Sequence, residues 1–220
     1  MATEKLRTAV RREQIAAAAL ELAATHGLRR LSIAAVARRV GLVPSAVYRH
    51  FRGKGEILDA MLDLIRGRLL RNVAAVCAET ADPATRLERL LMRHIELVRE
   101  NQGMPRILLS EDMASGDPQH RTRLYGSMRR YLGEIARIIE DGQRRGQFAA
   151  GFDPDTAAVL FLGLVMPPVI LWHMSDGAFD VTRQARRAWP LFLQALRSPK
   201  GPGGGRPATV GHRRPMPRTR

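Results

Sequence analysis

The sequence predicts an all-α protein, with an N-terminal three-helix unit that contains a helix-turn-helix and a C-terminal helical domain. Three observations favour this fold class. Apolar residues recur at the i, i+3, i+4, i+7 spacing of one helix face along most of the 220 residues. Asp-Pro pairs precede three such segments, at 82–83, 117–118 and 153–154, where the carboxylate can cap a helix and proline suits its first turn. No segment has the period-2 alternation of a half-buried strand.

Residues 32–51 predict two short helices joined by a tight turn. One apolar face of the first helix is formed by Ile33, Val36, Ala37 and Val40. Ser32 stands just ahead of them, where its hydroxyl can accept a hydrogen bond from a free backbone N–H. Gly41 ends the helix, because glycine adopts a left-handed backbone at little steric cost.

The second helix of the pair is predicted from Pro44 to Phe51. Val47 and Phe51 are four residues apart, so both can pack inward. Tyr48, Arg49 and His50 cannot all do so, and we expect them on the outer surface. Two helices that cross at a tight turn allow one of them to lie in a DNA major groove.

The charge distribution favours DNA binding over a solvated helical hairpin. Residues 1–55 hold eleven Lys and Arg against three Asp and Glu, a net charge of +8. Residues 56–197 have a net charge of only +1, and 198–220 carry six basic residues and no acid. The basic excess therefore coincides with the helix pair, as neutralisation of phosphates requires.

An ordered set of residues around this pair resembles a known family. A helix of the type R-x-x-I-x-x-A-A (Arg12, Ile15, Ala18 and Ala19) is followed by Gly27, by the 32–51 segment with its Y-R-H-F run, and by Lys54. From Thr8 to Asp63 the chain is similar to the DNA-binding domain of TetR/AcrR bacterial transcriptional regulators. The resemblance implies a DNA-binding domain over 8–55, an effector-binding and dimerisation domain over 56–197, and a basic tail over 198–220.

The resemblance also implies which residues contact double-stranded DNA. At the start of the second helix, Pro44, Ser45 and Ala46 would face base edges. Contacts to phosphates would come from Tyr48, His50 and Lys54. The front of the first helix would approach a phosphate strand with Ser32, Ile33 and Ala34. Arg49 is the candidate for base reading, because a guanidinium can bridge guanine O6 and N7. A basic arm would add attraction through Lys5, Arg7, Arg11 and Arg12. Val43, Ile33, Ala34, Gly53 and Gly55 depart from the usual pattern of the family.

Further helices are expected over 55–78, 82–100, 107–113, 117–146, 154–174 and 181–196. Pro167 and Pro168 would bend the fifth of these. The last two carry more large apolar residues than a monomer core can cover: Leu160, Leu164, Leu171, Trp172, Trp189, Phe192 and Leu193. In the family that the chain resembles, such helices form a four-helix bundle between two subunits. A homodimer of this kind would read a pseudo-palindromic operator.

The C-terminal domain is expected to bind a small lipophilic effector, which must favour the geometry that does not bind DNA. Candidate pocket residues are Met92, Met104, Met113, Tyr125, Met128, Phe161 and Met166, although methionine at helical spacing is also ordinary core. His94 and His173 are interpreted as core or interface histidines rather than metal ligands. No cluster has metal-site spacing, so neither metal nor cofactor is expected.

Composition indicates a cytoplasmic protein. Cys77 is the single cysteine, which suits a reducing compartment. No N-terminal secretory signal is present, and the apolar run 157–172 is shorter than the about 20 residues of a membrane span, so we interpret it as a buried helix. The Pro-, Gly- and Arg-rich tail is expected to be disordered.

Three function hypotheses follow. The first is a dimeric transcriptional regulator, a repressor that an effector releases from its operator. The second is a nucleoid-occlusion regulator of the same family, which acts on a division protein while bound to DNA; the residues after Glu100 and the run 187–191 faintly resemble such proteins. The third, an α-helical enzyme, is weak, because the sequence offers no nucleophile–base pair, phosphate loop or metal spacing.

Overall fold

All elements in the described part of the chain are helical. The computed structural model describes residues 2–101, 105, 107, 110 and 117–198. The helices are α1 (Ala2–His26), the 3-10 helix η1 (Leu28–Arg30), α2 (Ile33–Arg39), α3 (Pro44–Tyr48), α4 (Lys54–Glu79), α5 (Pro83–Glu100), α8 (Pro118–Arg144), α9 (Pro154–Gly163), α10 (Met166–Met174) and α11 (Val181–Arg197). The predicted fold class is therefore confirmed.

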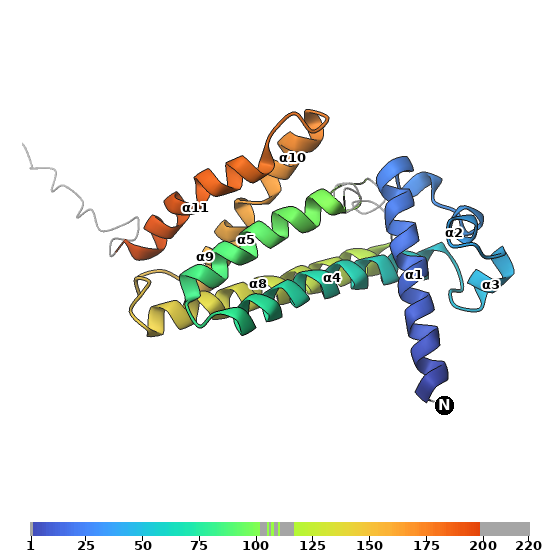
Figure 1. The fold of residues 1–220 in the computed structure, drawn as a ribbon, viewed down its shortest axis with the longest axis horizontal. Coiled ribbons are helices and arrows are strands. Elements are labelled where there is room, and N and C mark those ends of the chain that lie inside the picture. Colours follow the sequence, from blue (N-terminus) through green and yellow to red (C-terminus); the bar gives the residue numbers. More distant parts are fainter. Residues whose placement is uncertain (1, 102–104, 106, 108–109, 111–116, 199–220) are drawn as a thin grey trace, which may run out of the picture.

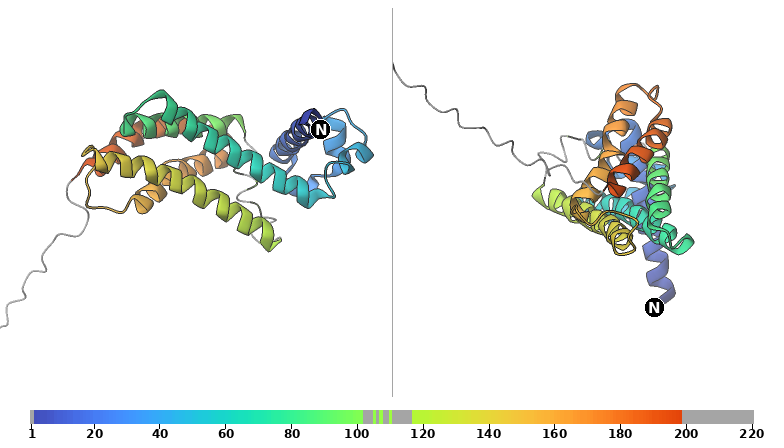
Figure 2. Two further views of the ribbon diagram at one scale, coloured as in Figure 1. Left: turned by 90° about the horizontal axis from the view of Figure 1, so that it is seen from below. Right: turned by 90° about the vertical axis from the view of Figure 1, so that its left-hand side faces the viewer.

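The molecule has a small head, made of α1, η1, α2 and α3, and a larger body of helices (Figure 1). α4 joins the two, because it packs on α1 in the head and on α5 and α8 in the body. Figure 2 shows α4 and α8 side by side along the body. In the head, Ile15, Ala19, Val36, Val47 and Phe51 are all 1% exposed or less, and they belong to one apolar core that continues through α4 into the body.

The apolar stripe predicted for the 82–100 helix is confirmed in α5. Leu87, Leu90, Leu91, His94, Ile95 and Val98 are buried. Opposite them on α8, Tyr131, Ile135 and Ile139 are also buried. Matched apolar faces on α4, α5 and α8 thus hold the body together by burial of apolar surface.

Aspartate caps begin α5, α8, α9 and α11, and the Asp-Pro pairs predict the first three of them. Asp82 and Asp153 each accept a hydrogen bond at 2.8 Å from the backbone N–H three residues later. Asp117 accepts from Gln119 N, also at 2.8 Å. Asp180, which no proline follows, caps α11 in the same way and accepts from Arg183 N at 2.9 Å.

The predicted helix at 154–174 is two helices, which corrects the expectation of a single bent one. α9 ends at Gly163, Leu164 and Val165 form a turn, and α10 begins at Met166 with its prolines in the first turn. Proline fits there because its missing N–H would be unpaired in any case. The stretch is apolar and long enough, by length and composition alone, to cross a membrane, but only 33% of it is buried in the molecule. The interpretation as a buried helix is therefore wrong in part, since much of its surface is open.

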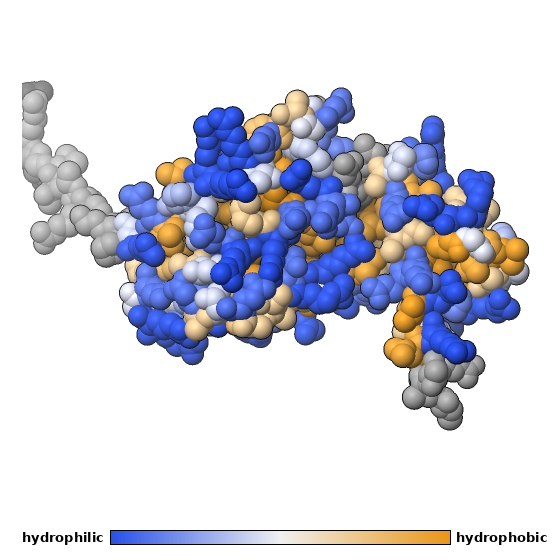
Figure 3. Space-filling model, in the orientation of Figure 1, coloured by the Kyte–Doolittle hydropathy of each residue, from blue (hydrophilic) through white to orange (hydrophobic). Residues whose placement is uncertain are grey.

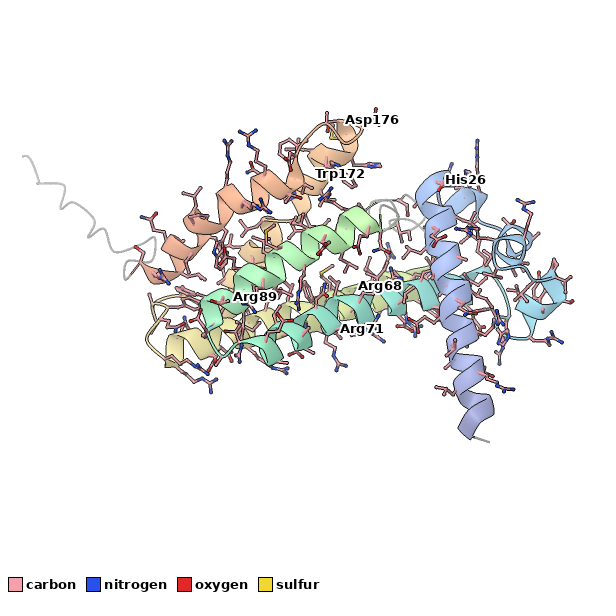
Figure 4. All side chains as sticks on the ribbon, in the orientation of Figure 1. His26, Arg68, Arg71, Arg89, Trp172 and Asp176 are labelled. Carbon is pink, nitrogen blue, oxygen red and sulfur yellow. The ribbon has the colours of Figure 1, made fainter. Side chains whose placement is uncertain are left out.

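A left-handed pair of residues ends α10. Asp176 has φ 50° and Gly177 has φ 89°, and Gly177 N donates to Trp172 O at 2.8 Å. Figure 4 labels Trp172 and Asp176 at this end of the body. The reversal turns the chain into α11. The helix expected at 107–113 lies outside the described residues apart from Ile107 and Ser110, and so does the tail from 199 onward.

Candidate nucleic-acid interface

The helix-turn-helix forms where the sequence predicts it. Ser32 caps α2 by accepting a hydrogen bond from Ala35 N at 3.1 Å. Gly41 takes a left-handed backbone with φ 68°, and Leu42 N donates to Ala37 O at 2.8 Å to close the turn. α3 then starts at Pro44 without a side-chain cap from Val43.

The recognition helix α3 is shorter than predicted. It ends at Tyr48 instead of Phe51, and the N–H groups of His50 and Phe51 both donate to Val47 O at 2.9 and 3.0 Å. These two bonds close a turn that carries Arg49 and His50 on its bend. Phe51 nevertheless packs inward, as its spacing from Val47 predicts, and is 1% exposed.

One row of α3 residues faces outward. Pro44, Ser45, Tyr48 and Arg49 are all exposed, with Tyr48 at 56%. Ala46 does not belong to this row: it is 6% exposed and lies beside the fully buried Val47. The expectation that Ala46 faces base edges is therefore corrected, because one side of so short a helix must pack on the head.

His50 is tucked against α1 rather than fully outward, which corrects the predicted trio of exposed residues. Its side chain is half-buried, and its Nδ1 has no hydrogen-bond partner among the described residues. Burial, followed by the positive charges of Arg12, Arg49 and Arg11, lowers the pKa of His50 below its usual value. His50 is thus neutral at pH 7, so it would meet a phosphate as a hydrogen-bonding group and not as a cation.

Arg12 belongs to the framework of the head and not to a free basic arm. Its guanidinium donates to the backbone oxygen of His50 and lies 4.1 Å from the centre of the Phe51 ring. The segment assigned to the arm is helical from Ala2, and its first turns project beyond the rest of the head (Figure 1). Leu6 and Val10 are exposed on this projection, whose apolar surface Figure 3 shows next to hydrophilic surface. Together with Arg7, Arg11 and His50 they line an open groove of about 560 Å³.

The front of α2 and the start of α4 flank α3. Ser32 and Ala34 are exposed, whereas Ile33 is half-buried and packs on the core. Lys54 is exposed on the first turn of α4. Gly53 gives α4 no side-chain cap, and the carboxylate of Glu56 accepts a hydrogen bond from Arg52 N, just before the helix, at 2.9 Å. This bond links Arg52 to the first turn of α4 and fixes the chain between the helix-turn-helix and the body.

The body contains a small apolar cavity that includes two of the predicted effector residues. Met128 and Met166 line it, together with His94 and Arg66, and its volume is about 30 Å³. His94 is the buried core histidine that the sequence predicts, and its Nδ1 lies 3.0 Å from the hydroxyl of Tyr131. Apolar residues complete the wall: Leu62, Ile65, Leu69, Val98, Pro105, Leu124, Leu162 and Val169.

Other predicted effector residues lie elsewhere. Met92 lines a separate groove between α5 and α11, and Tyr125 is 66% exposed on the outside of α8. Phe161 is completely buried against Phe192, with ring centres 5.9 Å apart. Met104 and Met113 lie outside the described residues. Helical spacing alone did not separate core residues from cavity residues, because both kinds are apolar and face inward.

The outer face of α9, α10 and α11 carries an exposed apolar surface. Its members are Val159, Leu160, Leu171, Met174 and Leu191, each at least 48% exposed. In the same helices, Trp189 and Phe192 are buried within the protomer, and Leu164, Trp172 and Leu193 are half-buried. The predicted surplus is thus present: Leu160 and Leu171 of the predicted set are exposed, together with Val159, Met174 and Leu191.

Known proteins resemble this chain along nearly its whole described length. Residues 15–61 match bacterial regulatory proteins of the tetR family, and residues 80–196 match the tetracyclin repressor-like C-terminal domain. The nucleoid occlusion factor SlmA of Photorhabdus laumondii is 24% identical over 187 residues, which cover 84% of this chain and 94% of SlmA.

Solved structures show the same arrangement of helices. The fatty acid degradation regulator FadR of Bacillus halodurans superposes with a TM-score of 0.74 at 22% identity, covering 84% of this chain and 96% of FadR. FadR of Bacillus subtilis in complex with stearoyl-CoA gives a TM-score of 0.71 at 21% identity, covering 86% and 98%. The helix-turn-helix head, the helical body and the two family matches lead to one conclusion: the chain belongs to the TetR family of DNA-binding, ligand-responsive transcriptional regulators.

Proposed function

We propose that this regulator represses transcription as a homodimer that binds a pseudo-palindromic operator in double-stranded DNA. The observation that carries the proposal is the outward row of Ser45, Tyr48 and Arg49 on a basic head. Ser45 and the exposed ring of Pro44 would lie against base edges. Arg49 is exposed just after α3, where its guanidinium would read a guanine through O6 and N7.

Phosphate contacts would hold the head on the DNA. Tyr48 and Lys54 are exposed on either side of Arg49, where a hydroxyl and an ammonium can bind neighbouring phosphates. Ser32 and Ala34 at the front of α2 would approach the backbone on the other edge of the groove. His50 would contribute as a neutral donor or acceptor, and Ile33 by apolar contact alone.

The exposed apolar surface on α9, α10 and α11 would form the dimer interface. Leu160, Leu171 and Leu191 present large aliphatic side chains to solvent in the protomer. Removal of such surface from water favours association. A two-fold axis that runs along this face, parallel to the long axis of the body, would place two heads at the same end of the dimer, as a palindromic operator requires.

The effector would be a lipophilic molecule that enters the cavity between α4, α5 and α8. Its wall is apolar, and Met128 and Met166 are flexible enough to move aside for a larger guest. A long-chain acyl-CoA is the class that we favour, because a FadR of the same fold is known in complex with stearoyl-CoA. Occupation of the cavity would shift α4, which carries the head.

Footprinting tests the proposal on the DNA that flanks the protein's own gene. We expect a protected site of two half-sites about one helical turn apart, released when stearoyl-CoA is added. Hexanoyl-CoA serves as the control, because it carries the same head group with little apolar chain. No protected site on this DNA would refute repression at the protein's own promoter, and protection unchanged by acyl-CoA would refute the effector class alone.

A DNA-bound nucleoid-occlusion role is the second candidate, because relatives along most of the chain bear that name. It predicts many dispersed chromosomal sites and no selective site at the protein's own promoter. Chromatin immunoprecipitation separates the two roles. In either role we expect the protein in the cytoplasm with the chromosome.

A further inference from the structure

A buried polar pair borders the apolar cavity of the body. His94 on α5 is 5% exposed and Tyr131 on α8 is 1% exposed. The tyrosine hydroxyl lies 3.0 Å from Nδ1 of His94, and the two rings meet edge to face with centres 5.3 Å apart. His94 also lines the cavity, whereas Tyr131 does not.

The hydrogen bond fixes which nitrogen of His94 carries the proton. The Tyr131 hydroxyl has no other partner among the described residues, so it must donate to His94 to avoid a buried unpaired O–H. Nδ1 is then the acceptor, and the proton of the neutral ring lies on Nε2. Burial lowers the pKa of His94 to about 4, which keeps the ring neutral at pH 7. No described residue accepts a hydrogen bond from Nε2.

The other polar groups of the cavity wall do not accept the hydrogen bond that Nε2 of His94 can donate. Ser127 donates its hydroxyl proton to Arg123 O at 2.9 Å, so it offers the cavity only an acceptor. Arg66 pairs with Asp63 at 3.0 Å on the surface side of α4. The cavity volume is about 30 Å³, so the open space beside these groups is small. A guest that fills the cavity would therefore have to supply the hydrogen-bond partner of Nε2 itself.

We propose that the cavity selects a lipid whose apolar chain carries an oxygen atom, as a hydroxyl or keto group, that accepts a hydrogen bond from Nε2 of His94. The inference rests on the proposed effector function and names the class of effector within it. A plain saturated chain would leave the N–H buried without a partner. A hydroxyl group on the ligand would also donate a hydrogen bond to the hydroxyl oxygen of Ser127.

Discrimination of this kind is strong because it penalises the wrong ligand. A site built to hydrogen-bond an oxygen rejects the analogue that lacks it, since the polar group of the protein is then left unpaired. Tyr131 acts as a positioning residue, because it holds the tautomer and the ring without touching the cavity. We expect the oxygenated ligand at its best position to bind about 10- to 100-fold more tightly than its saturated counterpart.

The test compares stearoyl-CoA with a positional series of hydroxystearoyl- and oxostearoyl-CoA by calorimetry on the full chain. At least one position should bind about 10-fold more tightly or better. His94→Gln should keep the preference, because its amide can accept from Tyr131 and still donate to the cavity. The double variant His94→Leu/Tyr131→Phe removes both polar partners together and should bind all members alike.

Equal binding of every member by the native protein, or no binding at all, overturns the inference. So does a preference that survives in the double variant. Imidazole ¹⁵N spectra at pH 7 test the premise without any variant: His94 should carry its proton on Nε2, and a proton on Nδ1 overturns the inference. Release of DNA by stearoyl-CoA with no gain from oxygenation would leave the proposed function intact while the inference fails.

Discussion

The guanidinium carbon of Arg12 lies 4.1 Å above the ring of Phe51, at the junction between α1 and the end of the helix-turn-helix. The same guanidinium donates to the backbone oxygen of His50. One side chain on α1 thus holds the two residues that follow Arg49, the candidate for base reading. The geometry of the recognition turn depends on a residue outside the helix-turn-helix.

Replacement of Arg12 should therefore weaken the head. Arg12→Met keeps an apolar stem over Phe51 but removes the charge and the donor, and we expect a loss of about 1–3 kcal/mol in the free energy of unfolding. Urea denaturation measures it. Arg11→Met, an equal loss of charge at an exposed neighbour, should stay within about 0.5 kcal/mol of the native protein. Equal effects of the two changes would show that Arg12 contributes only charge.

Arg49→Ala should relax specificity at one base pair. A bidentate arginine–guanine contact contributes about 1–3 kcal/mol of discrimination, so that position of the operator should become tolerant of substitution. Fluorescence anisotropy with singly substituted operators measures this. The control is Arg52→Ala, because the side chain of Arg52 is 95% exposed. It should either leave affinity unchanged or lower it to the same extent for every operator. Uniform weakening by Arg49→Ala would make that residue a phosphate contact.

The free energy of unfolding should decline on mild acidification because of two histidines, the buried His94 and the half-buried His50. The folded-state pKa values of His94 and His50 lie below the unfolded value of about 6.5, so the unfolded chain binds more protons. Their contribution is fully present above pH 6.5 and is lost as the pH falls. His94, with a pKa of about 4, should account for about 3 kcal/mol of that loss between pH 6.5 and 4.

Chemical denaturation across this pH range measures the slope. His94→Gln cannot titrate, so its unfolding free energy should be flatter between pH 6.5 and 4. Below pH 4 the carboxylates of Asp82 and Asp153, whose pKa values are lowered by hydrogen bonds from Thr85 and Thr156, should add a further loss. An unchanged slope in His94→Gln would contradict the assigned pKa of His94.

A charge cluster joins α8 to the part of α4 that enters the head. Arg123 lies 3.1 Å from Asp59 and 3.2 Å from Asp63. Because the pairs are partly solvated, a double-mutant cycle of Arg123→Met and Asp63→Asn should give a coupling of only about 0.5–1 kcal/mol. Arg137→Met, in an exposed pair within α8, is the matched control. A coupling near zero would mean that the cluster does not fasten α8 to α4.

Dimerisation should fail when a charge enters the exposed apolar surface. Leu160 is 60% exposed in the protomer, so Leu160→Glu should leave the fold intact while a buried carboxylate opposes association. We expect dissociation to monomers at micromolar concentration by analytical ultracentrifugation, with loss of operator binding. Tyr125→Glu changes a residue of similar exposure on α8 and should remain dimeric. A dimeric Leu160→Glu would place the interface elsewhere.

The sequence alone determined the fold class, the helix-turn-helix and the helix starts that Ser32 and the Asp-Pro pairs cap, but not the end of α3 at Tyr48 or the break between α9 and α10. Ser32, Gly41 and the Asp-Pro pairs act within one or two turns of chain, so their local hydrogen bonds and backbone preferences can be inferred from neighbours in sequence. The inward positions of Val47 and Phe51 followed from helical periodicity for the same reason.

Only the tertiary structure decided which inward residues form core and which border a cavity. Phe161 and Met166 share one apolar pattern, yet the first packs on Phe192 and the second lines the cavity. It also decided that Ala46 faces the core, that Arg12 reaches His50 across 38 positions, and that His94 meets Tyr131 across 37. These relationships depend on how helices that are distant in sequence cross one another. Burial of apolar surface drives that crossing, and because it is non-directional, a local sequence pattern does not indicate which residues will meet.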